Sequence, residues 1–102
     1  DINNSKLHIQ GTKEQLTRIQ ELITAVCQEH GTPDNELGLN VPLDVLIYKL
    51  AGCDEYRGNV QSMTLENEVL TLDVEHEKNA DEALKYALAK SFGSLSIKIV
   101  KS

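Results

Sequence analysis

The order of hydrophobic patterns along the second half of the chain is the strongest constraint on its fold. Two runs of alternating apolar and polar residues lie within 59–77, a helical stripe follows at 80–92, and a third alternating run covers 94–101. Alternation with a period of two indicates strands, whereas apolar residues at steps of three and four indicate an amphipathic helix. The second half therefore predicts strand, hairpin, strand, helix and strand, in that order.

The first half of the chain adds one strand and one long helix to this series. Residues 6–10 alternate, and residues 12–30 carry a single apolar stripe. Thr12 and Gln15 have the spacing of a capping box at the helix start, and Gly31 is typical of a helix end. The combined order is βαββαβ, which is the arrangement of the ferredoxin-like sandwich.

We therefore expect an α+β fold, a ferredoxin-like sandwich with a four-stranded antiparallel sheet, formed by residues 1–102 as a single domain. Strand 6–10 is expected between strands 95–100 and 69–75, with helices 12–30 and 80–92 on one face. A chain of 102 residues is long enough to bury one hydrophobic core without disulfides or metal.

Residues 42–51 predict an extra helix, inserted between strand 1 and strand 2, that a minimal sandwich lacks. Pro42 suits the first turn of a helix, and Gly52 suits its end. The apolar stripe of this helix consists of Leu43, Leu46, Ile47 and Leu50. It follows a loop at 31–40, and one expectation is that it partly roofs the polar face of the sheet. Insertions on a common scaffold often carry function, although many only pack.

Composition narrows the classes of partner. The chain has 16 acidic and 10 basic residues, a formal net charge of −6, so we expect no nucleic-acid partner, since phosphate binding needs clustered Lys and Arg. It contains no run of 18 apolar residues, so we expect no membrane partner. Two cysteines do not make a secreted disulfide scaffold, and we expect a reducing, cytoplasmic setting. The oligomeric state is left open.

A metal site can be weighed at the cysteines and histidines. Cys27 and His30 have C-x-x-H spacing, and Cys53 and His76 would complete four ligands. However, Cys27 falls on the helix stripe, where a small buried hydrophobe is expected, and His30 falls at the helix C-terminus, where imidazole interacts with terminal carbonyls. We therefore expect no metal and no cofactor, and a buried, reduced thiol at Cys27.

As with metal ligands, the sequence offers no clear set of catalytic residues. Asp73, Glu75 and Glu77 alternate along one strand, as the wet face of a sheet requires. Lys13 at a helix start could hold an anion but is explained by an ordinary capped helix. No nucleophile or phosphate-loop motif occurs, so we expect no catalytic residues and no enzymatic activity.

The best candidates for a partner-binding site are Tyr48, Tyr56 and Arg57, on the inserted helix and its exit. Tyr and Arg are enriched at interface hot spots, although they are equally ordinary as packing at the edge of a core. The favoured function is a non-enzymatic binding module for a protein partner. The alternative is a small-molecule-binding regulatory domain with its ligand between the inserted helix and the sheet.

Three segments of the chain also carry a likeness to a known family. They are 63–72 (MTLENEVLTL), 80–92 and 94–99 (SLSIKI), together with an opening strand and helix from residue 6. In these segments the chain resembles the plasmid- and phage-encoded YubB-type ferredoxin-like family, over about half of its length. The resemblance implies the ferredoxin-like fold and an origin as an accessory gene of a mobile genetic element. It leaves the biochemical function open.

Overall fold

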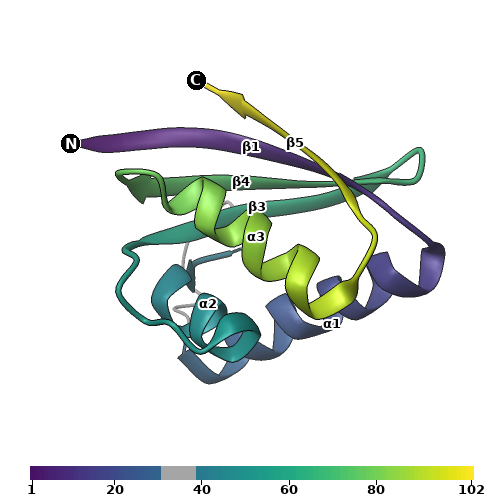
Figure 1. Ribbon diagram of the computed structural model, residues 1–102, viewed down its shortest axis with the longest axis horizontal. Helices are drawn as coiled ribbons and strands as arrows, with labels where there is room; N and C mark the ends of the chain where they lie inside the picture. The colour runs from purple at the N-terminus through teal and green to yellow at the C-terminus, as the bar shows by residue number, and fades with distance from the viewer. Residues whose placement is uncertain (31–38) are drawn as a thin grey trace.

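The computed structural model describes residues 1–30 and 39–102. Within that part of the chain it is an α+β fold, in which five strands form one antiparallel sheet and three helices pack against it (Figure 1). In chain order the elements are β1 (Ile2–Gln10), α1 (Lys13–His30), β2 (Val41–Pro42), α2 (Leu43–Ala51), β3 (Gly58–Glu66), β4 (Val69–Glu77), α3 (Ala80–Phe92) and β5 (Ser96–Lys101). The strand order across the sheet is β2-β3-β4-β1-β5.

The expected four-stranded sheet is corrected to five strands by the short strand β2. Val41 pairs with Val60, and Pro42 pairs with Asn59, so β2 extends the sheet beyond β3. Pro42 was expected in the first turn of a helix, but it has an extended backbone and caps the start of α2. A strand of two residues is too short to show alternation, and proline is tolerated at a sheet edge because its missing N–H is not needed there. The predicted place of β1, between β4 and β5, is confirmed.

The start of α1 and the end of α3 are held by hydrogen bonds of Thr12 and Gln15. The capping box at the start of α1 is confirmed, because the Gln15 N–H donates to Thr12 Oγ1 at 3.0 Å and the Thr12 N–H donates to Gln15 Oε1 at 2.8 Å. Gln15 Nε2 also donates to the carbonyl of Phe92, the last residue of α3, at 2.8 Å. The start of α1 is thereby tied to the end of α3. The expected terminator Gly31 lies outside the described residues.

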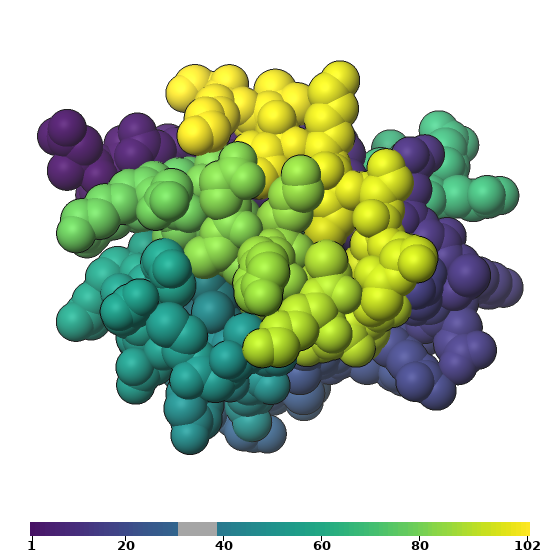
Figure 2. Space-filling view, in the orientation of Figure 1, coloured from purple at the N-terminus to yellow at the C-terminus, as the bar shows by residue number. Residues whose placement is uncertain are grey.

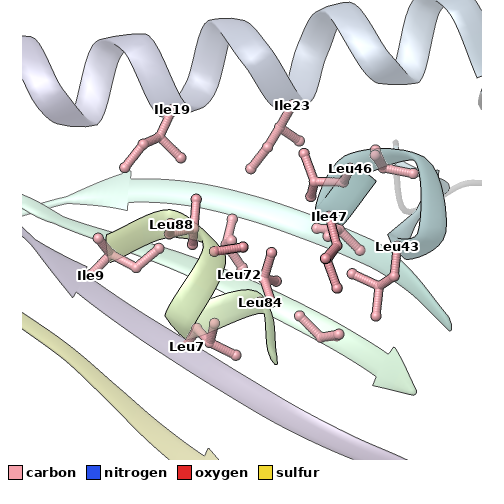
Figure 3. Packing of buried hydrophobic residues seen from close by; sticks show 14 of the residues in the cluster. Leu7, Ile9, Ile19, Ile23, Leu43, Leu46, Ile47, Leu72, Leu84 and Leu88 are labelled. Atoms are coloured by element: carbon pink, nitrogen blue, oxygen red, sulfur yellow. The ribbon is translucent and has the colours of Figure 1, made fainter. Parts of the chain in front are cut away.

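One hydrophobic core lies between the sheet and all three helices. Leu7 and Leu72 face each other across β1 and β4, and both are fully buried. Figure 3 shows these side chains packed among others from the helices, namely Ile19 and Ile23 of α1, Leu43, Leu46 and Ile47 of α2, and Leu84 and Leu88 of α3. The expected roof over the polar face is therefore wrong. The apolar stripe of α2 can be buried only on the apolar face, so α2 packs beside α1 and α3 (Figure 1).

The other face of the sheet is polar, and no helix of the described residues covers it. Lys6 is directly opposite Asp73 across the β1–β4 pair, and His8 Nδ1 lies 3.2 Å from Thr71 Oγ1. On the neighbouring strand, Ser62 Oγ donates to Asp73 Oδ2 at 3.0 Å. The sheet therefore has one dry face, which is buried under the helices, and one wet face, which is exposed to solvent, as an antiparallel sheet allows.

Three residues with positive φ shape the two ends of the β3–β4 hairpin. Asn67 and Glu68 have φ values of 52° and 65°, as the two central residues of a type I′ turn require. At the other end, Gly58 has a φ of 146°, and a Cβ added there would meet the Glu75 carbonyl oxygen and the Cα of His76. Glycine therefore lets β3 approach β4 closely at its first residue.

The buried Leu72 supplies a test of the core. We expect Leu72→Ala to lower the free energy of unfolding by about 2–5 kcal/mol, because it removes a fully buried side chain and leaves a cavity. Ile97, 9% exposed on the edge strand β5, should fall at the lower end of that range. Urea denaturation of both variants measures the change. Leu65→Ala, at a position that is 42% exposed, is the control and should cost less than either.

The hairpin supplies a second test, of opposite sign. Glu68 occupies a left-handed conformation that glycine adopts without steric cost. We expect Glu68→Gly to raise the free energy of unfolding by about 0.5–1 kcal/mol, a gain visible as a higher thermal midpoint. A Glu68→Ala variant keeps the Cβ and should show no such gain. A lower midpoint for Glu68→Gly would contradict the type I′ assignment.

Candidate functional site

The surface around α2 and α3 carries all three tyrosines of the chain, and we call it the helix-layer surface. Tyr48 lies on α2, Tyr56 lies in the connection after α2, and Tyr86 lies on α3. In Figure 2 the teal atoms of α2 and its exit border the green atoms of α3, so the two helices share one side of the molecule. This surface is the candidate functional site.

The burial of α2 determines which of its side chains are presented. Leu46 and Ile47 point into the core, so the next residue, Tyr48, points outward and is 58% exposed. Tyr48 borders a hollow of about 390 Å³, which is lined by His30, Asp44, Val45, Tyr48, Lys49 and Asp54. Charged groups of both signs surround one aromatic ring there. Charged side chains therefore edge the hollow, and the aromatic ring of Tyr48 gives it apolar surface.

The helix α3 presents its own tyrosine by the same logic. Leu84 and Leu88 are fully buried, and Tyr86, between them in sequence, is 67% exposed on the opposite side of the helix. Tyr86 borders a groove of about 350 Å³ between α2 and α3. The residues that line it are Ile47, Ala51, Cys53, Tyr56, Asn79, Glu82, Ala83, Tyr86 and Lys90. Apolar side chains from both helices face this groove, and two tyrosines and two opposite charges complete it.

The three residues singled out from the sequence are placed differently from one another. Tyr48 is exposed beside the first hollow, while Tyr56 is half-buried, packs against the core and lines the groove. Arg57 is exposed, and its carbonyl oxygen accepts a hydrogen bond from the Glu77 N–H at 3.2 Å, at the end of β4. The structure thus places Tyr48 and Tyr56 in two neighbouring depressions, and Arg57 is not among the described residues that line either.

Sequence reasoning missed Tyr86 and Cys53 as members of this surface. The apolar stripe of α3 explains Ala80, Leu84 and Leu88, and Tyr86 falls off it. An aromatic residue on the polar side of an alanine-rich helix is the signal that could have found it. Cys53 lies two residues beyond the end of α2, and the packing of α2 against α3 brings it to the groove.

A second feature is a buried polar cluster formed by Ser5, His76 and Asp81. Ser5 Oγ donates to Asp81 Oδ2 at 2.8 Å and lies 2.9 Å from His76 Nε2, which itself lies 3.4 Å from Asp81 Oδ2. All three side chains are at most 2% exposed. They come from β1, β4 and the first turn of α3, so the cluster joins α3 to the two central strands of the sheet.

The cluster is completed by charge at its edge and by the helix backbone. Lys101 Nζ, at the end of β5, lies 3.8 Å from Asp81 Oδ2, and the Glu82 N–H donates to Asp81 Oδ1 at 2.8 Å. Burial raises the pKa of Asp81, but the hydrogen bonds from Ser5 and the Glu82 N–H, with His76 and Lys101 nearby, outweigh it, so the pKa lies below its usual value. The carboxylate is therefore held in its charged form.

These contacts decide what the cluster can do chemically. A serine beside a histidine and an aspartate suggests nucleophilic catalysis, but there the hydroxyl gives its proton to the imidazole, which the carboxylate orients. Here the Ser5 hydroxyl donates directly to Asp81, which leaves Nε2 of His76 as the donor to Ser5. Ser5 is also 1% exposed, so no substrate reaches it. The cluster is arranged to hold α3 on the sheet.

Sequence reasoning missed this cluster because it began β1 at Lys6. Ser5 has the same strand phase as Leu7 and Ile9, and His76 has the same phase as Leu72 and Val74. Two polar residues in the core phase of paired strands are the signal, since a buried polar side chain requires a hydrogen-bond partner.

The cysteines and histidines weighed as zinc ligands are dispersed in the structure. Within residues 1–30 and 39–102, no three side chains of His, Cys, Asp or Glu are placed to hold one metal ion. Cys27 and Cys53 are free thiols, and both are half-buried at the margin of the core. The expectation of a fully buried Cys27 is therefore corrected, because its position on α1 lies at the side of the stripe that Ile23 and Val26 bury.

No helix among the described residues has the length and apolar character needed to cross a membrane. Comparison of the chain with models of known protein families, with curated proteins and with solved structures gave no match.

The buried cluster predicts how stability depends on pH. The pKa of Asp81 is lowered in the folded state, so the carboxylate stabilises the fold above its unfolded pKa of about 4, and this contribution is lost as the pH falls through the lower folded value. We expect Asp81→Asn to cost about 1–3 kcal/mol near neutral pH, since it removes charged hydrogen bonds and the attraction of His76 and Lys101. The cost should shrink below about pH 4, where the wild-type carboxylate also becomes neutral.

Urea denaturation at a series of pH values between 2 and 7 measures this difference. Glu82→Gln, at the next and exposed position of α3, is the matched control and should leave the pH dependence of the wild type unchanged. An unfolding free energy for Asp81→Asn that runs parallel to the wild-type curve through the acid range would contradict the role assigned to Asp81.

Proposed function

We propose that this chain is a non-enzymatic binding module that contacts a protein partner through the helix-layer surface. The observation that carries the proposal is the gathering of all three tyrosines at α2, its exit and α3, with Tyr48 58% and Tyr86 67% exposed. Tyrosine gives a large, rigid contact area at low entropic cost and is enriched at interface hot spots. Rings left open to water on one surface are better explained by a contact than by packing.

The groove between α2 and α3 defines the chemistry of the partner. Its floor is apolar, from Ile47, Ala51 and Ala83, and its rim carries Glu82 and Lys90. A protein segment that inserts an apolar side chain between the helices, flanked by polar groups that pair with the two rim charges, matches this surface. Tyr48 and the hollow beside it widen the contact along α2.

The alternative function, small-molecule binding, was expected to use a site between the inserted helix and the sheet. The space between α2 and the sheet is filled by Leu43, Leu46 and Ile47, each at most 1% exposed. The two depressions of the helix-layer surface are open to solvent, with Tyr48 and Tyr86 on the outside of the molecule instead of inside a cavity. A drug-sized ligand usually buries most of its surface in an enclosed pocket, so the surface favours a macromolecular partner.

The arrangement of the four long strands also supports a proposal about the fold and the origin of the chain. We infer a ferredoxin-like arrangement for β1, α1, β3, β4, α3 and β5, to which α2 and the short edge strand β2 are added. The resemblance in segments 63–72, 80–92 and 94–99 supports the proposal that the module belongs with accessory proteins of mobile elements. That fold hosts many unrelated functions, so the proposed role depends on the helix-layer surface and not on the fold.

The exposed tyrosines make the proposal testable without loss of the fold. We expect Tyr48→Ala and Tyr86→Ala to change the free energy of unfolding by about 0.5 kcal/mol or less, because both rings are largely exposed. At an anchoring position, either change should weaken partner binding by about 1–2 kcal/mol or more. Tyr56→Ala should instead lower stability, since Tyr56 packs against the core.

The partner is captured first and the variants are compared afterwards. A photo-crosslinking amino acid replaces Tyr86 in one protein and Thr64, on the open face of the sheet, in the control. The proposal requires a protein crosslinked from position 86, absent from position 64, whose measured affinity falls in Tyr86→Ala and is retained in Lys85→Ala. Equal affinities of the two alanine variants and of Tyr48→Ala would refute the helix-layer surface as the contact.

A further inference from the structure

The outer edge of β5 is independent of the helix-layer surface and ends the sheet on that side. β5 pairs with β1 and with no other described strand, and it forms the rim of the sheet in Figure 1. The Ser102 N–H donates to the Asn4 carbonyl at 2.9 Å, and these two residues continue the β1–β5 register. Because bonded and non-bonded pairs alternate in an antiparallel ladder, Val100, Lys98 and Ser96 also face β1 with their backbone groups.

It follows that the other residues of β5 present their backbone groups outward. They are Ile97, Ile99 and Lys101, and each offers one N–H and one C=O at the rim. Each face of this rim carries apolar side chains next to a lysine: Ile97 and Ile99 lie with Lys101 on the helix side, and Val100, 42% exposed, lies with Lys98 on the open side. An unpaired edge of this kind is a template for another strand.

We propose that this edge pairs with the same edge of a second copy of the chain, antiparallel, about a two-fold axis at Ile99. In that register Ile99 faces Ile99 of the second copy, and Ile97 faces Lys101 of the second copy. All three outward residues then become bonded pairs, so every free N–H and C=O of the rim gains a partner. The result is a closed, isologous dimer with one continuous sheet, whereas pairing β5 with the β3 edge would build an open chain of molecules.

Repulsion between the lysines of two β5 strands is the main objection to self-pairing. The register about Ile99 keeps these lysines from facing one another. β5 carries Lys98 and Lys101 and no acidic residue, so two copies bring like charges to one seam. About the axis at Ile99, however, Lys98 faces Val100 of the second copy, and Lys101 faces Ile97 of the second copy. The nearby Lys6 is already opposite Asp73 within its own sheet. No lysine is directly opposite another, and the long stems of the lysines cover the isoleucine and the valine.

The seam is short, so we expect a weak dimer that depends on concentration and that salt strengthens by screening the lysines. Sedimentation of the 102-residue chain across a concentration series measures it. Val100→Glu puts a carboxylate opposite Lys98 of the second copy twice, and we expect roughly tenfold tighter association. Val100→Lys puts two like-charge pairs at the same places and should weaken association by a similar factor, while Lys98→Glu with Val100→Lys should restore it.

Cysteine crosslinking fixes the register. In a background with Cys27→Ser and Cys53→Ser, Ile99→Cys places two thiols on residues about 5.5 Å apart at Cα, within the range of a disulfide. Ile97→Cys places them about 14 Å apart at Cα, because an offset of four residues along the strand adds to the spacing between the strands, and should not crosslink. If the serine background does not fold, the charge variants in the native chain decide alone.

The possible results distinguish pairing with a second copy from pairing with an acidic partner strand. Rapid crosslinking at position 99 but not 97, with the ordered response to Glu and Lys at position 100, supports the dimer. A chain that stays monomeric at millimolar concentration, or that crosslinks equally at both positions, overturns it. A monomer whose β5 amide signals shift only on addition of an extended acidic peptide, with salt weakening the effect, also overturns it and assigns the edge to an acidic partner strand.

Discussion

The pairing of β1 with β4 is the constraint on which the rest of the structure depends. Its register places Leu7 opposite Leu72 and Ile9 opposite Leu70, so that one face of the two central strands is entirely apolar. A shift of β1 by one residue would turn Leu7 and Ile9 to the wet face and bury Lys6 in their place. Every helix must therefore pack on the same face, including α2, and the opposite face must remain wet. The position of the helix-layer surface is a consequence of that pairing.

The packing of α2 beside α3 makes the inserted helix part of the helix-layer surface. A helix of nine residues is too short to be stable alone, so α2 depends on the burial of Leu43, Leu46 and Ile47 for its existence. Those same contacts turn Tyr48 outward and bring Cys53 and Tyr56 against α3. Structure and candidate function thus use opposite sides of one short helix. Ser91 Oγ, which donates to the Leu50 carbonyl at 2.7 Å, fixes the two helices to each other at this junction.

Much of the fold, but little of the site, is predictable from the sequence. The bounds of α3 and the capping box of α1 are local properties, and both were predicted to the residue. β2 was missed because its two residues pair only through the tertiary position of β3, and β1 was begun late because Asn3, Asn4 and Ser5 hide its alternation. Tyr86 and Asp81 gain their roles from contacts with residues distant in sequence. Periodicity carries no information about such contacts, whereas it determines which face of each element is buried.

The buried cluster links the two ends of the chain to the middle of the fold. Asp81 binds Ser5 of β1 and lies near Lys101 of β5, so the last residue of the edge strand is attracted to a carboxylate in the first turn of α3. That carboxylate is also adjacent to the helix start from which Glu82 and Ala83 reach the groove. Lys101 is 64% exposed, so its attraction to Asp81 is screened and modest. The hydrogen bonds among Ser5, His76 and Asp81 are shielded from water and set the position of α3. Asp81 therefore positions the start of α3, beside which the groove lies, and contributes only weakly to the order of the β5 edge.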